Sequence, residues 1–293
     1  MNEYENAIEL RGVSKTYKDF GLENVSFKVP KGCIMGFIGQ NGAGKTTTIR
    51  SMLNITKINS GEISLLGLDH VQNEAEIKKR IAVVFDDLPF HDMFTVKDIA
   101  KIFEGLYPEW DNNVYLYYLD LFQLPYKKKI GKFSKGMKMK LQIACALSHN
   151  AELLIMDEAT AGLDPVVRDE ILHIFMEYLQ DGERSILMSS HITSDLEKIA
   201  DMVTFIDKGR ILLTGYKDEL IERHGIIKCG YDKLTKIDPD DIVSIRTNNF
   251  GAEVMVNNKE QALSKYSDCI IDPANIDDIM LFYVHRYDEE WLR

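Results

Sequence analysis

Residues 39–46 spell GQNGAGKT, a pattern of the form GxxxxGK[ST]. The apolar run CIMGFI precedes the pattern at 33–38, and KTTTIRSMLN follows at 45–54, which predicts a buried strand before it and a helix after it. Glycines let the backbone wrap around a phosphate with its N–H groups pointing inward, and the positive end of the helix dipole adds attraction. A glycine-rich turn formed by chance is the alternative, and the flanking strand and helix argue against it. The segment therefore predicts a loop that binds the phosphates of a nucleotide.

Two side chains of this loop can take part in chemistry. Lys45 can reach the β- and γ-phosphates, and the Thr46 hydroxyl can ligate Mg²⁺. The other residues would hold the phosphates mainly through their backbone. The predicted nucleotide-binding residues of the loop are Gly39, Gln40, Asn41, Gly42, Ala43, Gly44, Lys45, Thr46 and Thr47.

A second motif, LLIMDE at 153–158, predicts a buried strand that ends in two acids. In an open parallel sheet, ligands bind at the carboxyl ends of the strands. Asp157 can hold Mg²⁺ there, and Glu158 can act as the general base for an attacking water. Two acids that only cap a strand are the alternative, which the phosphate loop makes less attractive.

His191 directly follows SILMSS, the next predicted strand at 185–190. An imidazole at a strand end can bond a γ-phosphate oxygen or orient the attacking water. A lone histidine more often has no catalytic role. Its position in the chain after the two acids is the reason to expect one here.

Lysines are concentrated in FSKGMKMK at 133–140, although the chain as a whole has a net charge of -11. Ser134 can cap a helix that begins at Lys135, and Gly136 keeps the backbone open there. A helix tip with free N–H groups and lysines suits a phosphate. Spacing alone, however, favours a solvated basic face on an ordinary helix.

The composition excludes several classes of protein. Hydrophobic residues make up 45% and charged residues 28% of the 293 residues, as in globular proteins. The acidic net charge of -11 argues against general nucleic-acid binding. No apolar run approaches the roughly 18 residues of a membrane helix, so we expect any work at a membrane to need a partner. The cysteines are widely spaced, which predicts reduced thiols; they are Cys33, Cys145, Cys229 and Cys269.

The pattern along the chain changes twice. Residues 95–150 have helical periodicity, with Thr95 and Asp98 placed to form a capping box. After about residue 225, a predicted hairpin and two predicted helices form a small α/β appendix. We therefore expect a main domain at 1–225 with a helical part at about 90–150, and an accessory domain at 226–293.

In this order, the motifs over roughly residues 5–220 resemble those of the nucleotide-binding subunit of ABC transporters. GQNGAGKT matches the Walker A loop, LLIMDE matches the Walker B strand with Glu158 as the catalytic acid, and FSKGM lies at the signature motif. AGLD at 161–164 resembles the D-loop, His191 the switch histidine, and Tyr17 the aromatic residue that stacks on adenine.

The resemblance implies an α/β P-loop NTPase fold of the ABC ATPase type. It implies a helical signature subdomain, N-terminal antiparallel β elements and a small C-terminal α/β appendix, with ATP and Mg²⁺ as cofactors. In that family, two ATP molecules lie between two subunits packed head to tail. Ser134 and Gly136 would therefore act in trans, on ATP bound by a second ATPase subunit in a homodimer or heterodimer. The implied catalytic residues are Lys45, Glu158 and His191.

Three positions in two motifs depart from the family pattern. Asp86 stands where the family usually has a glutamine that gives Mg²⁺ a neutral carbonyl ligand, so the predicted metal ligands are Thr46, Asp86 and Asp157. In the signature, Lys135 replaces a glycine and Met137 a glutamine. This signature is similar to that of bacterial ABC-2-type exporters.

The function implied by the resemblance is the ATP-hydrolysing subunit of a bacterial ABC exporter for a peptide, drug or other amphipathic substrate. It would bind a separately encoded transmembrane permease at the cytoplasmic face of the cell membrane, with no nucleic acid involved. A non-transport ABC ATPase, such as an assembly, repair or translation-type factor, is the alternative. A nucleotide switch with negligible turnover is a third possibility, against which Glu158 argues.

Overall fold

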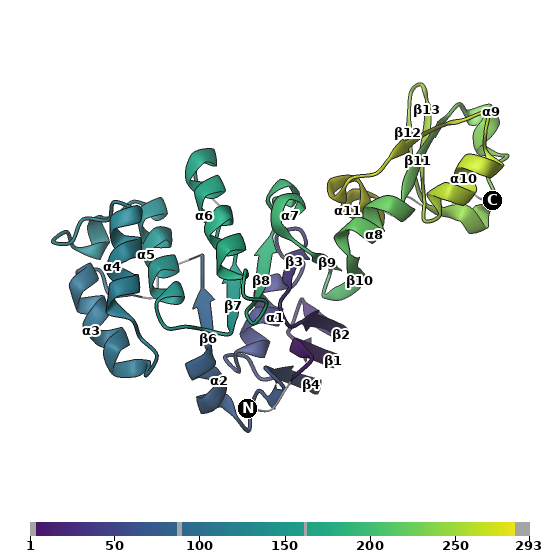
Figure 1. Ribbon diagram of the computed structural model, residues 1–293. Helices are drawn as coiled ribbons and strands as arrows, with labels where there is room; N and C mark the ends of the chain where they lie inside the picture. The colour runs from purple at the N-terminus through teal and green to yellow at the C-terminus, as the bar shows by residue number, and fades with distance from the viewer. Residues whose placement is uncertain (1–3, 87–89, 161–162, 285–293) are drawn as a thin grey trace.

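The computed structural model describes residues 4–86, 90–160 and 163–284, and the strands within them form three sheets (Figure 1). The central sheet has six strands in the order β10-β9-β3-β8-β7-β6, parallel except for β10 at one edge. Its strands are β3 (Ile34–Ile38), β6 (Ile81–Val84), β7 (Leu153–Asp157), β8 (Ser185–Ser190), β9 (Met202–Asp207) and β10 (Arg210–Tyr216).

The central strands β3, β7 and β8 are buried throughout, which explains why β3 and β7 are nearly continuous apolar runs. Alternate residues of β7 point to opposite faces. Leu154 and Met156 join one hydrophobic core, and Leu153 and Ile155 join the other. Because β3, β8 and β7 are parallel neighbours, the loop after β3, the acids after β7 and His191 after β8 emerge at one edge of the sheet.

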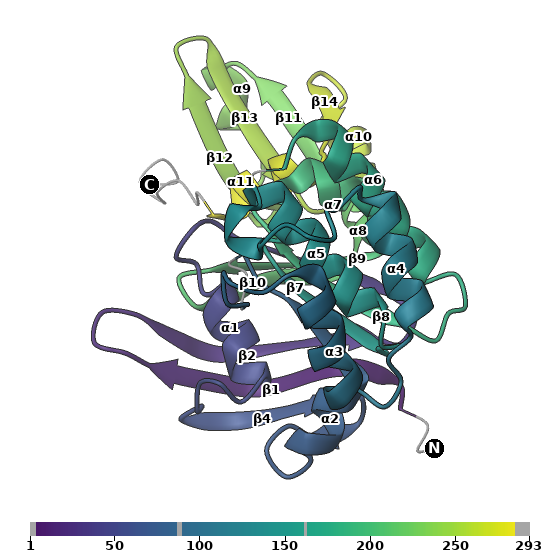
Figure 2. The ribbon, with the colours of Figure 1, turned by 90° about the vertical axis from the view of Figure 1, so that its left-hand side faces the viewer.

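One of these cores is covered by an antiparallel N-terminal sheet of order β2-β1-β4-β5 (Figure 2). Helix α1 packs into the same core through Ile49 and Met52. A short helix, α2, precedes β6 and was not predicted from the sequence. The elements of this layer are β1 (Asn6–Thr16), β2 (Gly21–Pro30), α1 (Lys45–Met52), β4 (Ser60–Leu65), β5 (Leu68–Asp69) and α2 (Glu74–Arg80).

The helical region has the caps that the sequence predicts. The Thr95 hydroxyl accepts a hydrogen bond from the Asp98 N–H, and the Asp98 carboxylate accepts one from the Thr95 N–H at 2.9 Å, so the capping box is confirmed. The Ser134 hydroxyl accepts from the Met137 N–H at 3.2 Å and caps the next long helix, α5. The elements are α3 (Val96–Leu106), α4 (Asn112–Leu121), the 3-10 turn Ile130–Lys132 and α5 (Lys135–Leu147).

Three further helices belong to the core on the side of α5. The Asp164 carboxylate caps the first of them by accepting from the N–H groups of Val166 and Val167. Among the described helices, none combines the length and the apolar character needed to cross a membrane. These three helices are α6 (Pro165–Tyr178), α7 (Thr193–Ile199) and α8 (Lys217–Arg223).

The C-terminal part forms an antiparallel sheet of order β12-β13-β11-β14 with a small core of its own that includes Ile227 and Val254. Figure 1 shows it at the opposite end of the molecule from α3 and α4. The predicted hairpin corresponds to β12 and β13. The elements are β11 (Gly225–Cys229), α9 (Tyr231–Leu234), the 3-10 turn Pro239–Asp241, β12 (Ile242–Asn248), β13 (Gly251–Val256), α10 (Lys259–Lys265), β14 (Ile270–Pro273) and α11 (Ile276–Val284).

Helix α11 leads back from this C-terminal sheet to the main core. Its Phe282 is 1% exposed and belongs to the same buried cluster as Leu220 of α8. The Glu197 carboxylate on α7 accepts a hydrogen bond from the Ile276 N–H at 2.9 Å, at the first turn of α11. The Thr193 hydroxyl donates to Asp277 at 3.2 Å. The helix that follows His191 is therefore in direct contact with the C-terminal part of the chain.

Candidate nucleotide-binding site

The loop between β3 and α1 is shaped by two glycines. A Cβ at Gly39 would lie 2.5 Å from the Ile206 carbonyl oxygen, so the packing leaves no room for a side chain. Gly44 has a φ of 118°, a conformation that favours glycine, and it precedes the first residue of α1. No side chain caps α1, and no acidic residue lies in its first turn. The N–H groups of that turn can therefore donate to an anionic ligand.

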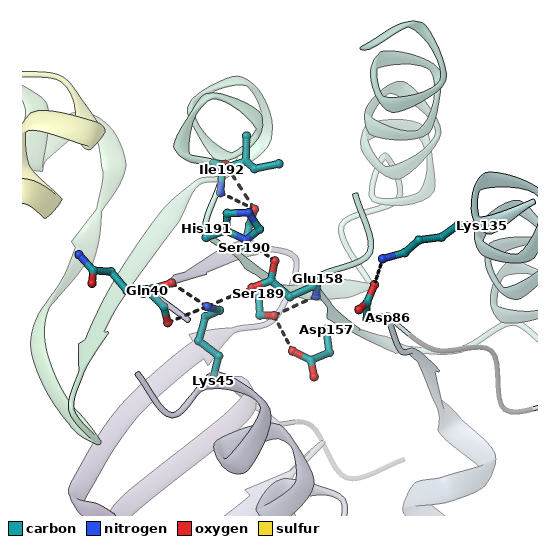
Figure 3. Close-up of polar contacts among 11 residues, drawn as sticks. Gln40, Lys45, Asp86, Lys135, Asp157, Glu158, Ser189, Ser190, His191 and Ile192 are labelled. Carbon is teal, nitrogen blue, oxygen red and sulfur yellow. Dashed lines mark hydrogen bonds and ion pairs between the residues drawn. The ribbon is translucent and has the colours of Figure 1, made fainter. Parts of the chain in front are cut away.

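Lys45 is only 5% exposed, and its ammonium group is held inside this loop (Figure 3). It donates to the Gly39 carbonyl at 2.6 Å and to the Gln40 carbonyl at 3.2 Å, and it lies 3.0 Å from Glu158 Oε1. A buried ammonium needs such partners, because burial without them is costly. These contacts hold the Lys45 ammonium at a position where it could bind a phosphate of the nucleotide.

A cavity of about 380 Å³ opens at this loop, a volume in the range of small-molecule sites. The uncapped helix start, the Lys45 ammonium and the Thr46 hydroxyl provide hydrogen-bond donors and a metal ligand. This set fits the phosphates of a nucleotide with Mg²⁺. The described residues lining the cavity are Phe20, Gln40, Asn41, Gly42, Gly44, Lys45, Thr46, Thr47 and Glu158.

The two remaining predicted loop residues are Gly39 and Ala43, which stabilise the loop around the cavity. The Ala43 N–H donates to the Gln40 carbonyl at 3.1 Å, and the Ala43 carbonyl accepts from the Gly209 N–H at 2.8 Å. Ala43 is 4% exposed. Gly39 and Ala43 therefore help to hold the shape of the loop, while neither is among the described residues that line the cavity.

Asp157 and Glu158 are held together by a serine that is not among the residues predicted from the sequence. Asp157, 5% exposed, accepts from the Ser189 hydroxyl at 2.8 Å, and the same hydroxyl oxygen accepts from the Glu158 N–H at 3.1 Å. Ser189 lies opposite Asp157 in the parallel pair of β7 and β8. The polar end of SILMSS was the signal in the sequence that could have identified it.

Glu158 lies between two basic groups. Its φ of 57° is in the left-handed region, which non-glycine residues seldom adopt and which turns the chain sharply after β7. One carboxylate oxygen lies 3.0 Å from the Lys45 ammonium, and the other lies 2.6 Å from His191 Nδ1. His191 remains 44% exposed on its side chain. The arrangement brings an acid, a lysine and a histidine from three neighbouring strand ends together.

Asp86 and Lys135 lie apart from this trio (Figure 3). The Lys135 ammonium is 2.5 Å from Asp86 Oδ1, which pairs the two charges. Ser134 and Gly136 flank Lys135 at the tip of α5. Neither is among the described residues that line the Lys45 cavity of the same chain.

The predicted adenine-stacking residue is only partly integrated into the site. Tyr17 is 45% exposed, and its ring centroid lies 6.5 Å from that of Phe20 in a stacked arrangement. Phe20, rather than Tyr17, lines the cavity. The feature of the sequence that could have indicated Phe20 is its aromatic side chain in the turn between β1 and β2. Of the expected D-loop, residues 161 and 162 lie outside the described part of the chain.

The comparisons with known proteins agree with this geometry. The family model described as "ABC transporter" matches residues 22–161. The chain is 37% identical over 208 residues to the bacitracin transport ATP-binding protein BcrA of Bacillus licheniformis, which covers 70% of this chain and 68% of that protein. It is 34% identical over 247 residues to the Nod factor export ATP-binding protein I of Rhizobium sp. (strain N33), covering 82% of this chain and 80% of that protein.

A solved structure supports the same conclusion. A protein described as the ATP-binding subunit of an ABC transporter superposes with a TM-score of 0.68 at 27% identity, over 74% of this chain and 92% of that one. The predicted resemblance and fold class are thereby confirmed. From its relatives, its matched domain and its fold, the chain belongs to the ABC transporter family, as one of its ATP-binding and ATP-hydrolysing subunits.

Proposed function

We propose that this chain hydrolyses Mg-ATP at the cavity around Lys45 and thereby powers export in bacteria. The observation that supports this best is Glu158, which is held 3.0 Å from Lys45 and 2.6 Å from His191 at the mouth of the phosphate loop. A carboxylate in this position can accept a proton from water next to a bound γ-phosphate. A nucleotide-binding protein without turnover would not need a base there.

The proposed mechanism assigns each group one task. The loop N–H groups and Lys45 bind the phosphates, and a γ-phosphate entering the loop competes with Glu158 for the lysine. Released from Lys45, Glu158 accepts the proton of the attacking water, while His191 holds the carboxylate or the water in place. Thr46 and Asp157 would hold Mg²⁺, which neutralises phosphate charge when bound. Asp86 remains a proposed further ligand.

Exchange of Glu158 for glutamine tests the proposal. Glu158→Gln keeps the shape but removes the base, so we expect ATP binding to persist while phosphate release falls by about 100-fold or more. Glu222→Gln, the same exchange on the exposed surface of α8, is the matched control. Phosphate release by Glu158→Gln at the rate of the unmodified chain would refute the assignment.

The transported substrate and the membrane partner are part of the same proposal. One relative is named for bacitracin transport and another for Nod factor export. We propose that this chain likewise serves export of a peptide, drug or other amphipathic compound. It would act with a transmembrane permease at the cytoplasmic face of the membrane. Residues 226–293 would form an accessory, non-catalytic domain.

A second ATPase subunit would complete the site, because Ser134 and Gly136 lie outside the cavity of their own chain. We propose that they contact ATP bound by the partner subunit. Mixing a Lys45→Ala chain with a Ser134→Arg chain leaves one intact composite site in each mixed dimer. We expect phosphate release above that of either variant alone. If mixed dimers form without any recovery, the site is built within one chain.

The non-transport alternative, an assembly or translation-type ABC ATPase, shares the ATP-driven dimer. Both relatives described above carry transport or export in their names, which favours the exporter. Co-purification of this chain with an integral membrane protein would separate the two functions.

A further inference from the structure

We infer that Lys135 is a positioning residue for nucleotide binding, because it neutralises and holds Asp86 beside the nucleotide site. This inference rests on the proposed function. The geometry brings the two residues together from separate elements: Asp86 follows β6, Lys135 is the first residue of α5, and their charged atoms lie 2.5 Å apart.

Asp86 belongs to the same sheet edge as the catalytic acids. Strand β6 pairs with β7 in parallel, with Val84 opposite Met156. Asp86 and Glu158 each follow these paired residues by two positions, so both lie at the carboxyl edge of the sheet. This edge therefore carries the carboxylates of Asp86, Asp157 and Glu158 close to where anionic phosphates would bind.

Each of these carboxylates has a partner in the described structure, and the partners differ in charge. Glu158 faces Lys45 and His191, and Asp157 accepts from the neutral Ser189 hydroxyl. Asp86 is offset by Lys135. Without Lys135, the edge would gain one uncompensated negative charge next to the site of an anionic ligand.

The position of Asp86 is fixed by a buried clamp. Gln142, 4% exposed, accepts from the Phe85 N–H at 3.1 Å and donates to the Phe85 carbonyl at 2.9 Å. Phe85 immediately precedes Asp86. Gln142 lies seven residues after Lys135, two turns along α5, and therefore on the same face of the helix. The same helix face thus holds the backbone before Asp86 and the side chain of Asp86 itself.

The Asp86–Lys135 pair is too exposed to serve mainly for stability. The two side chains are 50% and 52% exposed, and exposed ion pairs contribute little to folding. The neighbouring Lys138, one turn further along α5, is paired instead with Asp92, 3.9 Å away. The effect of Lys135 should therefore appear in nucleotide binding and depend on Asp86.

A double-mutant cycle with Lys135→Met and Asp86→Asn tests this dependence in the full-length chain. The readout is the affinity for a fluorescent ATP analogue, with EDTA and with Mg²⁺, at low and high salt. We expect Lys135→Met to weaken binding of the metal-free analogue by about 3- to 10-fold at low salt. In the Asp86→Asn background, Lys135→Met should have almost no effect on affinity. High salt should reduce the effect of Lys135→Met in the otherwise unmodified chain.

Lys138→Met is the matched control, because it removes the same charge from the same helix without touching the pair. Its effect should be equal in both backgrounds. The inference is overturned if Lys135→Met weakens binding equally with and without Asp86, since Lys135 would then act on the nucleotide directly. It is also overturned if Lys135→Met has no effect. Thermal unfolding of each variant checks that the chain stays folded.

The outcomes separate this inference from the proposed function. If the unmodified chain neither binds nor hydrolyses ATP, the proposed function fails. If it hydrolyses ATP and depends on Glu158, but the cycle is additive, only the role of Lys135 is wrong.

Discussion

Glu158 shows how much of the site is decided by single residues at strand ends. Its backbone turns at a φ of 57°, and its two carboxylate oxygens reach Lys45 and His191. The sequence predicts these three residues because each follows an apolar strand within a short motif. It does not predict Ser189 or Phe20, because their roles depend on which strands and turns become neighbours.

His149 gives a prediction at this scale about pH. His149 is 2% exposed, its ring centroid lies 4.1 Å from that of Tyr107 in a tilted arrangement, and burial lowers the pKa of His149 below its ordinary 6.5. The unfolded chain therefore binds a proton more readily than the folded chain at pH values below about 6.5. The free energy of unfolding should decrease as the pH falls through this range.

Replacing the ring with an amide tests that dependence on pH. His149→Gln should lower the slope of unfolding free energy against pH between about pH 7 and 5, because one buried titrating group is lost. His173→Gln is the control, since the His173 side chain is 68% exposed. Urea unfolding at several pH values measures the slope. An unchanged slope in His149→Gln would show that His149 does not produce the dependence.

At the scale of elements, the strength of the local pattern decides what can be predicted. Strands β3, β7 and β8 are buried throughout, and α3 begins at a capping box, so these elements are visible in the sequence. Helix α2 buries only Ile77, and β14 has no buried residue, so neither leaves a clear periodicity. Packing against neighbours, rather than local pattern, forms these two.

Helix α11 supplies the prediction for this scale. Phe282 lies in the main core and is 1% exposed. The Arg246 guanidinium lies over its ring, with Cζ 4.4 Å from the ring centroid. Phe282→Ala should lower the unfolding free energy by about 3–5 kcal/mol and leave the affinity of the folded chain for ATP almost unchanged. Phe250→Ala is the control, because Phe250 is 95% exposed. A loss below about 1 kcal/mol would mean that α11 contributes little to the core.

For the whole molecule, the sequence indicates two hydrophobic units, and the structure adds how they meet. Residues such as Ile227 and Val254 form the separate C-terminal core. The cluster around Leu220, however, continues into Ile276 and Phe282 of α11. No local pattern could reveal this, because a helix with apolar residues on most of its surface does not indicate which neighbour it will pack against.

A second cavity, of about 290 Å³, lies between the central sheet and the helical region. Its wall includes Phe85 and Gln142, which precede and clamp the Asp86 position. Under the proposed function, this cavity is where we expect an apolar segment of the permease to dock, because its described lining is mainly apolar. Its other described lining residues are Leu53, Ile55, Lys78, Ile81, Val83, Phe90, Phe103, Tyr107, Cys145, Ala146 and His149.

An exposed residue at the rim of this cavity allows a test of permease docking. Ile55 is 60% exposed, so Ile55→Asp should fold normally but place a charge where the apolar segment would dock. We expect weaker co-purification with the permease and unchanged basal ATPase activity. Val71→Asp, at a residue 54% exposed outside the cavity, is the control. Equal co-purification of both variants would place the permease elsewhere.

The hydrogen bond from the Ile276 N–H to Glu197 has a consequence for exchanging parts between relatives. A chimaera joined after α8 would take its last helix from one parent and the acid that holds the start of that helix from the other. The graft would be compatible only if the recipient keeps an acceptor at position 197 and a matching donor for Asp277 at position 193. A transplant of the C-terminal part should therefore include α7, although α7 ends 24 residues before the end of α8.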